Sequence, residues 1–331
     1  MNAPNSFKIA VLDDYQGAAL KLADWKSLPA SVSVEVFREP LDGFEAAAAA
    51  LAAFDCICLM RERLPFPRAL FERLPRLRLI VLTGARSPSL DAQAATDHGV
   101  VISHTRGGGT DATTSELTWA LILAAARHLP REERRMREGG WQSTLGFTLR
   151  DKTLGVLGLG KLGSRVARIG QAFEMNVIAW SANLTAEKAD EIGVTRVEKE
   201  ELFSRSDVLT VHLVLSERSR GLVGARELAL MKPTALLVNT SRGPIVDEAA
   251  LVAALTAGRI GGAGLDVFNE EPLPRDHPLR RLENAVLTPH LGYVTTETYA
   301  QFYQDTVEDI AAFLAGSPIR VLNPEVLEKR G

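Results

Sequence analysis

The stretch TLGVLGLGKLGSRVARIGQAF, residues 153–173, decides the fold of this chain. Its apolar start, Thr153–Leu157, predicts a strand, its end, Leu162–Phe173, predicts a helix, and glycines spaced GxGxxG join the two. In such a turn the first glycine permits the tight bend, the second lets backbone approach a pyrophosphate, and the third lets helix and strand pack closely. The helix N-terminus adds N–H groups and a positive dipole. The stretch therefore predicts a dinucleotide-binding βαβ unit, with a purely structural glycine turn as the alternative.

The end of the next strand bears on the choice of cofactor. An acidic residue about 20 positions after the glycines normally holds the ribose 2′-hydroxyl of NAD. The predicted strand Asn176–Trp180 is followed by Ser181, Ala182 and Asn183, and none of these is acidic. None is an arginine that would favour the 2′-phosphate of NADP. The cofactor is therefore predicted to be NAD or NADP, with NAD favoured.

Short apolar runs alternate with helical patterns along the rest of the chain, as in βαβ units with parallel sheets. In the first hundred residues the predicted strands are Phe7–Leu12, Val32–Phe37, Asp55–Leu59, Leu77–Leu82 and Val100–Ile102. The helices predicted between them are Ala18–Trp25, Phe44–Ala53, Arg68–Arg73 and Leu90–Thr96. The later strands are predicted at Asn176–Trp180, Val208–Val214, Ala235–Asn239, Gly262–Val267 and Ala285–Leu287. The predicted fold class is α/β, with parallel sheets of Rossmann-like or flavodoxin-like type.

A glycine-rich segment separates the two series of strands. Three consecutive glycines within Thr105–Thr110 favour neither helix nor strand and predict a flexible joint. A long helix, Ala112–Arg127, is predicted after it and is expected to stop at Pro130. Further helices are predicted at Glu248–Ala257 and Glu297–Leu314. With 331 residues, the chain is too long for one ordinary core, and we expect two domains.

The composition excludes several kinds of partner. A net charge of -3 gives no electrostatic reason to expect nucleic acid or an anionic membrane. The longest apolar stretches, Ala46–Phe54 and Leu121–Ala126, fall far short of the roughly 20 residues that cross a bilayer. The N-terminus lacks the pattern of a secretory signal. Cys56 and Cys58 are predicted to fill the core rather than bind a metal, and we expect a cytoplasmic protein without disulfides or metal.

Three polar side chains, Arg242, Glu271 and His290, each follow one of the last three predicted strands. Ligands bind beyond the carboxyl ends of parallel strands, so we expect all three on the rim that carries the glycine loop. A guanidinium can hold a carboxylate beside a carbonyl, and a histidine can protonate that carbonyl as hydride arrives. A carboxylate beside the histidine favours its imidazolium form. Singly, each residue could be a surface charge or a satisfied loop residue; together they predict nicotinamide-dependent reduction of a 2-keto acid.

The chain resembles the D-isomer-specific 2-hydroxyacid dehydrogenases across nearly its full length, with phosphoglycerate dehydrogenases and glyoxylate–hydroxypyruvate reductases among them. The matching stretches, in chain order, are VLTGARSPSLDAQAATDHGVVI, SELTWALILAAAR, GGW, LGVLGLGKLGSRVA, VLTVHLVLS, LLVNTSRGPIVDEAAL, GAGLDVFNEEPL and LTPHLG. The resemblance implies an enzyme that interconverts a D-2-hydroxy acid and its 2-keto acid. It also implies that Arg242 binds the substrate carboxylate and carbonyl, that His290 is the acid/base and that Glu271 orients His290.

The resemblance further implies an arrangement of domains. Residues 1–105 and 295–331 would form the substrate-binding domain and residues 106–294 the dinucleotide-binding domain, with an active-site cleft and hinge crossings at 105–110 and 293–296. The implied substrate contacts are Gly84, Ala85, Arg86, Arg242 and His290. The implied cofactor contacts are Gly158, Gly160, Lys161, Leu162, Gly163, Ser181, His212, Leu213, Val214, Thr240, Arg242, Asp266, His290 and Gly292. A homodimer through the cofactor domains is implied too, and an arm around Gly139–Trp141 suits it.

Two departures from the family pattern leave questions open. Ser181 stands where many members have the aspartate that selects NAD. Arg86 and Ser87 stand where a glycine and a small or aromatic residue are commoner. Arg86, together with Arg61, could add positive charge for an anionic substrate tail such as a phosphate, or both could face solvent.

The substrate and the direction of the reaction also stay open. Glyoxylate, hydroxypyruvate and 3-phosphoglycerate all fit, although the chain ends soon after its last helix and leaves no room for the regulatory domain of many phosphoglycerate dehydrogenases. Formate oxidation is disfavoured, because the formate enzymes of the family lack the glutamate that Glu271 supplies. The alternative function is a nucleotide-sensing, corepressor-like interaction protein with little or no turnover. Such proteins carry long tails that this chain lacks.

Overall fold

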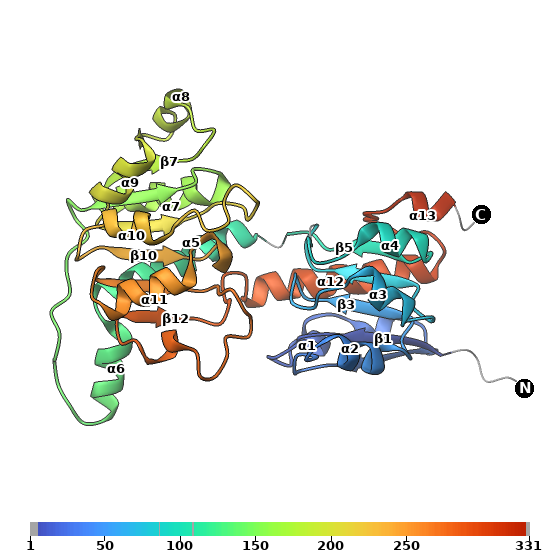
Figure 1. The fold of residues 1–331 in the computed structure, drawn as a ribbon. Helices are drawn as coiled ribbons and strands as arrows, with labels where there is room; N and C mark the ends of the chain where they lie inside the picture. Colours follow the sequence, from blue (N-terminus) through green and yellow to red (C-terminus); the bar gives the residue numbers. More distant parts are fainter. Residues whose placement is uncertain (1–5, 86, 108, 329–331) are drawn as a thin grey trace, which may run out of the picture. The chain divides into compact units, whose positions relative to one another are not determined.

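The computed structural model describes residues 6–85, 87–107 and 109–328, and the chain divides into two compact units (Figure 1). Unit 1 comprises Met1–Gly109 and Thr295–Gly331, and unit 2 comprises Thr110–Val294. Unit 1 thus extends past the predicted limit at residue 105. Arg106 explains the difference, because its backbone N–H donates to the Oδ2 atom of Asp305 at 2.7 Å and its guanidinium pairs with the same buried carboxylate.

Unit 1 is built on a five-stranded parallel sheet in the order β2-β1-β3-β4-β5, the flavodoxin-like order (Figure 1). Its strands are β1 (Phe7–Val11), β2 (Val32–Val36), β3 (Cys56–Leu59), β4 (Leu79–Leu82) and β5 (Val101–His104). Its helices are α1 (Ala19–Leu22), η1 (Trp25–Ser27), α2 (Phe44–Leu51), α3 (Arg68–Glu72), α4 (Ala92–Asp97), α12 (Thr296–Leu314) and α13 (Glu325–Glu328).

Both faces of this sheet are covered, because successive side chains of a strand point to opposite sides. One face shares a core with α2, α3 and α4, through residues such as Leu51, Leu70 and Ala94. Helix α12 packs against β4 and β5 and contacts α1. Cys56 and Cys58 of β3 are buried free thiols, which agrees with their predicted place in the core.

Unit 2 is built on a seven-stranded parallel sheet in the order β12-β11-β10-β9-β6-β7-β8, which is the Rossmann order with one added edge strand (Figure 1). Its strands are β6 (Thr153–Leu157), β7 (Asn176–Trp180), β8 (Thr195–Arg196), β9 (Val208–Val211), β10 (Leu236–Asn239), β11 (Gly262–Leu265) and β12 (Ala285–Leu287). Its helices are α5 (Thr110–Ala126), α6 (Leu129–Arg137), α7 (Lys161–Ala172), α8 (Ala186–Asp190), α9 (Lys199–Arg205), α10 (Ala225–Leu230), η2 (Gly243–Ile245), α11 (Glu248–Thr256) and η3 (Pro278–Arg281). The predicted fold class is confirmed.

Helices cover both faces of this sheet as well. Helices α9, α10 and α11 share one core with it, through Leu202, Leu228 and Leu251. Helices α5 and α7 share the other core, through Ile122 and Val166. The carboxyl ends of β6, β9, β10, β11 and β12 therefore form a single rim between two helical layers.

Two sequence predictions about local structure were wrong. The strand predicted at Val208–Val214 ends at Val211, because its pairing with β10 ends there and Val214 is 80% exposed. Pro130 does not stop a helix; it lies in the first turn of α6, where a proline's missing N–H is tolerated. No residue of α6 is buried, and the sequence was not predicted to form a helix there.

Across the described ranges, no helix combines the length and apolar character that crossing a bilayer requires.

Candidate active site

The glycine-rich turn lies at the carboxyl end of β6 and opens α7. Gly158 has φ +104°, and a Cβ atom there would lie 2.8 Å from the carbonyl oxygen of His212. A Cβ atom at Gly163 would lie 2.0 Å from the carbonyl oxygen of Gly158, so only glycine lets the helix approach the strand this closely. A Cβ atom at Gly160 would meet nothing within 4 Å. The middle glycine thus faces open space at the N-terminus of a twelve-residue helix, a cradle that fits a pyrophosphate.

The carboxyl end of β7 is where the cofactor's ribose is expected. Ser181 is half-buried, and its carbonyl oxygen accepts the N–H of Leu184 at 3.0 Å in a turn. Ala182 and Asn183 are exposed. This turn carries no acidic side chain of its own at residues 181–183, so it contributes no charge that would repel a 2′-phosphate.

The loop after β9 holds three predicted cofactor contacts. The ring Nε2 atom of His212 lies 2.9 Å from Thr210 Oγ1, and burial lowers the pKa of His212 to about 4. This ring is therefore neutral at physiological pH. The carbonyl of Leu213 accepts the hydroxyl of Ser241, which ties the loop after β9 to the loop after β10.

His290 and Glu271 form a pair on this rim. The Nδ1 atom of His290 lies 2.5 Å from Glu271 Oε2, and the side chains keep 22% and 29% of their accessible area. The other carboxylate oxygen of Glu271 accepts the backbone N–H of Phe268 at 2.9 Å. Because Nδ1 is engaged, Nε2 is the ring nitrogen that remains for a substrate. The predicted histidine–carboxylate pair is present.

The pKa of Glu271 is set by opposing effects. Burial raises the pKa, but the hydrogen bond and charge of His290, the N–H of Phe268 and the charge of Arg242 lower it further. The net pKa lies below its ordinary value, so the carboxylate stays ionised at neutral pH. The influence of Arg242 on this carboxylate also means that all three predicted catalytic side chains lie near one another.

Asp266 is fully buried and holds the turn that presents His290. Its Oδ1 atom accepts the hydroxyl of Thr288 at 2.6 Å and the N–H of Leu291 at 2.7 Å, and its Oδ2 atom accepts the N–H of Gly292 at 2.9 Å. Within this turn His290 has φ +55°, a conformation that non-glycine residues seldom adopt. The three bonds therefore fix an otherwise unfavourable backbone geometry at His290.

Arg242 lies where β10 passes into η2. Its carbonyl oxygen accepts the side-chain amide of Asn239 at 3.0 Å, and its Nη1 atom donates to the carbonyl of Ser241 at 2.7 Å. The next residue, Gly243, is in such close contact that a Cβ atom would lie 2.1 Å from the backbone of Phe268. The arginine turn and the segment that leads to Glu271 are therefore packed directly together.

The predicted substrate loop belongs to unit 1 and follows β4. Gly84 has φ +86°, and its N–H donates to Thr105 Oγ1 at 3.0 Å. Arg61 lies against this loop: its Nη1 atom donates to the carbonyl of Thr83 at 3.4 Å, and a Cβ atom at Gly84 would lie 2.3 Å from Nη1. The loop backbone is thus already engaged at Gly84, and Ala85 is exposed. The predicted contact Arg86 lies outside the described residues.

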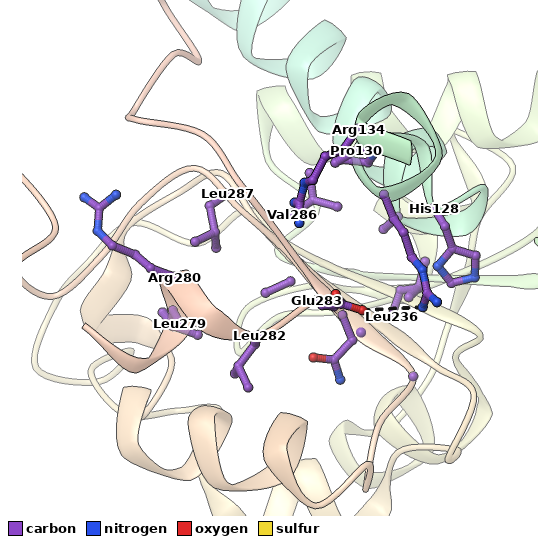
Figure 2. A pocket seen from close by; sticks show the side chains of 16 residues that line it. His128, Pro130, Arg134, Leu236, Leu279, Arg280, Leu282, Glu283, Val286 and Leu287 are labelled. Carbon is purple, nitrogen blue, oxygen red and sulfur yellow. Dashed lines mark ion pairs between the residues drawn. The ribbon is translucent and has the colours of Figure 1, made fainter. Parts of the chain in front are cut away.

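A cavity of about 260 Å³ lies at the opposite end of the unit 2 sheet (Figure 2). It is lined by the first residues of β10, β11 and β12, such as Leu236 and Ala285, and by residues at the start of α6. Arg131 and Glu283 form an ion pair at its edge, with 3.5 Å between Nη1 and Oε2 (Figure 2). Ligands of open α/β sheets bind at the carboxyl ends of the strands, so we place the active site at the other rim.

Comparisons with known proteins show which family the chain belongs to. Residues 119–292 match the family model described as D-isomer specific 2-hydroxyacid dehydrogenase, NAD binding domain. The chain is 43% identical over 271 residues to the glyoxylate reductase of Aeropyrum pernix, covering 79% of this chain and 81% of that protein. It is 38% identical over 264 residues to the D-3-phosphoglycerate dehydrogenase of Archaeoglobus fulgidus, covering 79% of this chain but only 50% of that protein. A crystal structure of phosphoglycerate oxidoreductase from Vibrio cholerae o395 aligns with a TM-score of 0.89 and 37% identity, over 94% of this chain and 100% of that one.

A Rossmann sheet with a glycine cradle and a histidine–carboxylate pair on one rim defines a nicotinamide-dependent dehydrogenase. More narrowly, the chain belongs to the D-isomer-specific 2-hydroxyacid dehydrogenase family. The resemblance recognised from the motifs is confirmed, and so are the enzyme class and the NAD-binding character of the fold.

The sequence reading missed the contribution of α5 to this site. The helix was predicted at Ala112–Arg127 without any role in the site, yet Thr118 Oγ1 lies 2.8 Å from Thr240 Oγ1 and Thr114 Oγ1 donates to the carbonyl of Gly292 at 2.9 Å. The signal was available, because Thr114 and Thr118 are polar residues four positions apart on a largely apolar helix.

Proposed function

We propose that this enzyme reduces small 2-keto acids, above all glyoxylate and hydroxypyruvate, with Arg242, Glu271 and His290 as its catalytic residues. The observation that carries the proposal is the 2.5 Å contact between His290 Nδ1 and Glu271 Oε2 on the rim that also bears the glycine cradle. The name of the Aeropyrum pernix relative supports the substrate class. Unit 2 is the dinucleotide-binding domain in this proposal, and unit 1 contributes the substrate loop.

Each of the proposed catalytic residues has a separate role. Arg242 binds the substrate carboxylate and the keto oxygen through its guanidinium fork. His290 donates a proton from Nε2 to the keto oxygen during reduction and takes it back during oxidation. Glu271, ionised because its pKa is lowered, holds Nδ1 and stabilises the protonated ring. Asp266 keeps the His290 turn in place.

The cofactor is a nicotinamide dinucleotide, which supplies or accepts the hydride when bound. Gly158, Gly160 and Gly163 would hold its pyrophosphate at the start of α7, with Lys161 and Leu162 in the first turn. Ser181 would face the ribose, and the loop His212–Val214 with Thr240 and Gly292 would line the rest of the site. We propose that NADP is accepted beside NAD, because no acidic side chain stands at residues 181–183.

The decisive experiment follows absorbance of the reduced nicotinamide with NADH and, separately, NADPH. The substrates are glyoxylate, hydroxypyruvate, pyruvate and phosphohydroxypyruvate, and His290→Ala is the control. We expect turnover with the first two acids and a loss of roughly 10²- to 10⁴-fold in the variant, the range that general acid–base catalysis supplies. Cofactor binding without turnover on any acid would instead favour the sensing, corepressor-like role.

We also propose that the enzyme is a cytoplasmic homodimer joined through unit 2. The segment after α6 exposes large apolar side chains to water, which is unfavourable: Trp141 is 69% exposed and Leu145 is 95% exposed. A second copy is the occupant we assign to this face. Light scattering on the wild type and on Trp141→Ala with Leu145→Ser tests it, and an unchanged mass of one chain in both would overturn it.

A further inference from the structure

Helix α5 carries one polar stripe along its length. Asp111, Thr114 and Thr118 are spaced three and four residues apart, so they lie on the same face of the helix. The helix packs against α7, β10 and β11 (Figure 1). Each member of the stripe contacts a different part of the rim described above.

Thr114 contacts the turn of the acid/base residue. Its Oγ1 atom donates to the carbonyl of Gly292 at 2.9 Å, two residues after His290. The N–H of the same Gly292 is held by Asp266. A Cβ atom at Gly292 would lie 3.3 Å from Thr114 Oγ1 and 3.3 Å from Asp266 Oδ2, so the peptide is clamped between the two side chains.

Thr118 contacts the turn of the arginine. It is fully buried, and its Oγ1 atom lies 2.8 Å from the hydroxyl of Thr240, two residues before Arg242. Asp111 reaches the third part, since its Oδ2 atom lies 3.4 Å from Lys161 Nζ at the start of α7.

We infer that the stripe Asp111–Thr114–Thr118 aligns the three working parts of the site: the cofactor cradle, the His290 turn and the Arg242 turn. This inference rests on the proposed function of those parts. The three residues are positioning residues, because their side chains act on catalytic groups only through Lys161, Gly292 and Thr240.

The geometry makes a helix suited to this task. Residues 111 and 118 are separated by about 10 Å along a rigid helix axis, at 1.5 Å per residue. Loops, by contrast, move more than the elements that carry them. Because three segments of the site are bound to one helix, the helix fixes the distances between them. Loss of one hydroxyl should displace only the segment that this hydroxyl binds.

The first test is Thr114→Val, which keeps the shape and removes the donor to Gly292. We expect kcat to fall about fivefold, because the His290 turn is released. Thr114→Ser keeps the donor and should restore kcat. Thr113→Val is the matched control on the same helix, since among the described residues its hydroxyl bonds only to the carbonyl of Thr110 at 3.2 Å. Equal effects of the two valine variants on kcat would overturn the inference.

The second test concerns Thr118, at the other end of the stripe. Thr118→Val should raise the Kd for NADH about fivefold in a fluorescence titration without substrate, because Thr240 is a proposed cofactor contact, and Thr118→Ser should restore it. An NADH affinity unchanged by Thr118→Val would contradict the inference. This readout needs no turnover. If the wild type binds NADH but reduces no keto acid, the proposed function is wrong. The titration would still decide whether α5 positions the cofactor-binding segment.

Discussion

Each unit of the molecule carries a carboxylate paired with an aromatic ring just beyond a strand of its sheet. In unit 1 the hydroxyl of Tyr15 donates to Asp13 Oδ1 at 2.9 Å after β1. In unit 2 the Nδ1 atom of His290 lies 2.5 Å from Glu271 Oε2 beyond β11 and β12. Both pairs join a carboxylate to a ring, but the two rings differ in their acid–base chemistry, since one is a phenol and the other an imidazole.

The difference arises from the ring and its surroundings. Burial and the nearby Asp13 raise the pKa of Tyr15 to about 12, so its proton stays in place under physiological conditions. Arg63 lies over the same ring, 4.7 Å from its centroid, and adds a cation–π contact. The ring of the other pair is an imidazole, the side chain that most often transfers protons in catalysis, and the pKa of its partner Glu271 is lowered. A carboxylate–ring pair thus becomes an acid/base device only when the ring can titrate at the working pH.

Among the variants that test this contrast between the two pairs, the largest effect should come from Glu271→Gln, which removes the charge and keeps the shape. We expect kcat to fall about 10- to 100-fold, because a hydrogen bond to a charged group is worth about 1.5–3 kcal/mol. Steady-state reduction of glyoxylate with NADH measures it. A variant as active as the wild type would show that the pair in unit 2 is as inert as the pair in unit 1.

A smaller loss, about tenfold in kcat, is expected from Asp266→Asn. The amide NH₂ would face an N–H donor of the His290 turn instead of accepting from it, so the turn would loosen. Asp207→Asn is the matched control at the other end of the same sheet, where Asp207 accepts the N–H of Thr153 at 2.8 Å. Equal losses in both variants would mean that general destabilisation, rather than the His290 turn, explains the result.

The pair in unit 2 should also affect how the free energy of unfolding depends on pH. A carboxyl whose pKa is lowered on folding stabilises the folded state above its ordinary pKa of about 4.5, and this stabilisation is lost as pH falls through the lowered value. The free energy of unfolding of the wild type should therefore exceed that of Glu271→Gln by on the order of 1 kcal/mol at pH 7, a modest difference because solvent partly screens the pair. Below pH 4 the difference should be smaller, because the carboxylate becomes protonated. Urea unfolding at both pH values measures the gap. A gap that widens in acid would contradict the lowered pKa.

The sequence predicted much of this molecule for identifiable reasons. Strand–helix alternation predicted both parallel sheets, and the glycine spacing predicted the cradle at α7, because these are local signals. Arg242, Glu271 and His290 were predicted to share a rim, because parallel strands end at the same edge.

Other features depend on tertiary contacts, and no local pattern names the distant partners of those contacts. Helix α6 has no buried residue, so packing against the core gives no account of it. The hydrogen bonds of Thr114 and Thr118 join residues more than a hundred positions apart. The contact of Arg61 with Gly84 could not be predicted either, since the sequence left open whether Arg61 faces solvent or contacts the substrate.

The smallest effect should come from Tyr15→Phe, the change that tests unit 1 of the comparison directly. The variant loses the hydrogen bond to Asp13, so a stability cost of about 1 kcal/mol is expected. Because the phenol cannot release its proton near neutrality, kcat should stay within about twofold and the pH profile should keep its shape. Thermal unfolding and a pH series of glyoxylate reduction between pH 5 and 9 (the range over which an imidazole titrates) give both readouts. A displaced pH profile would mean that the tyrosine pair also handles protons, and the contrast between the two units would then fail.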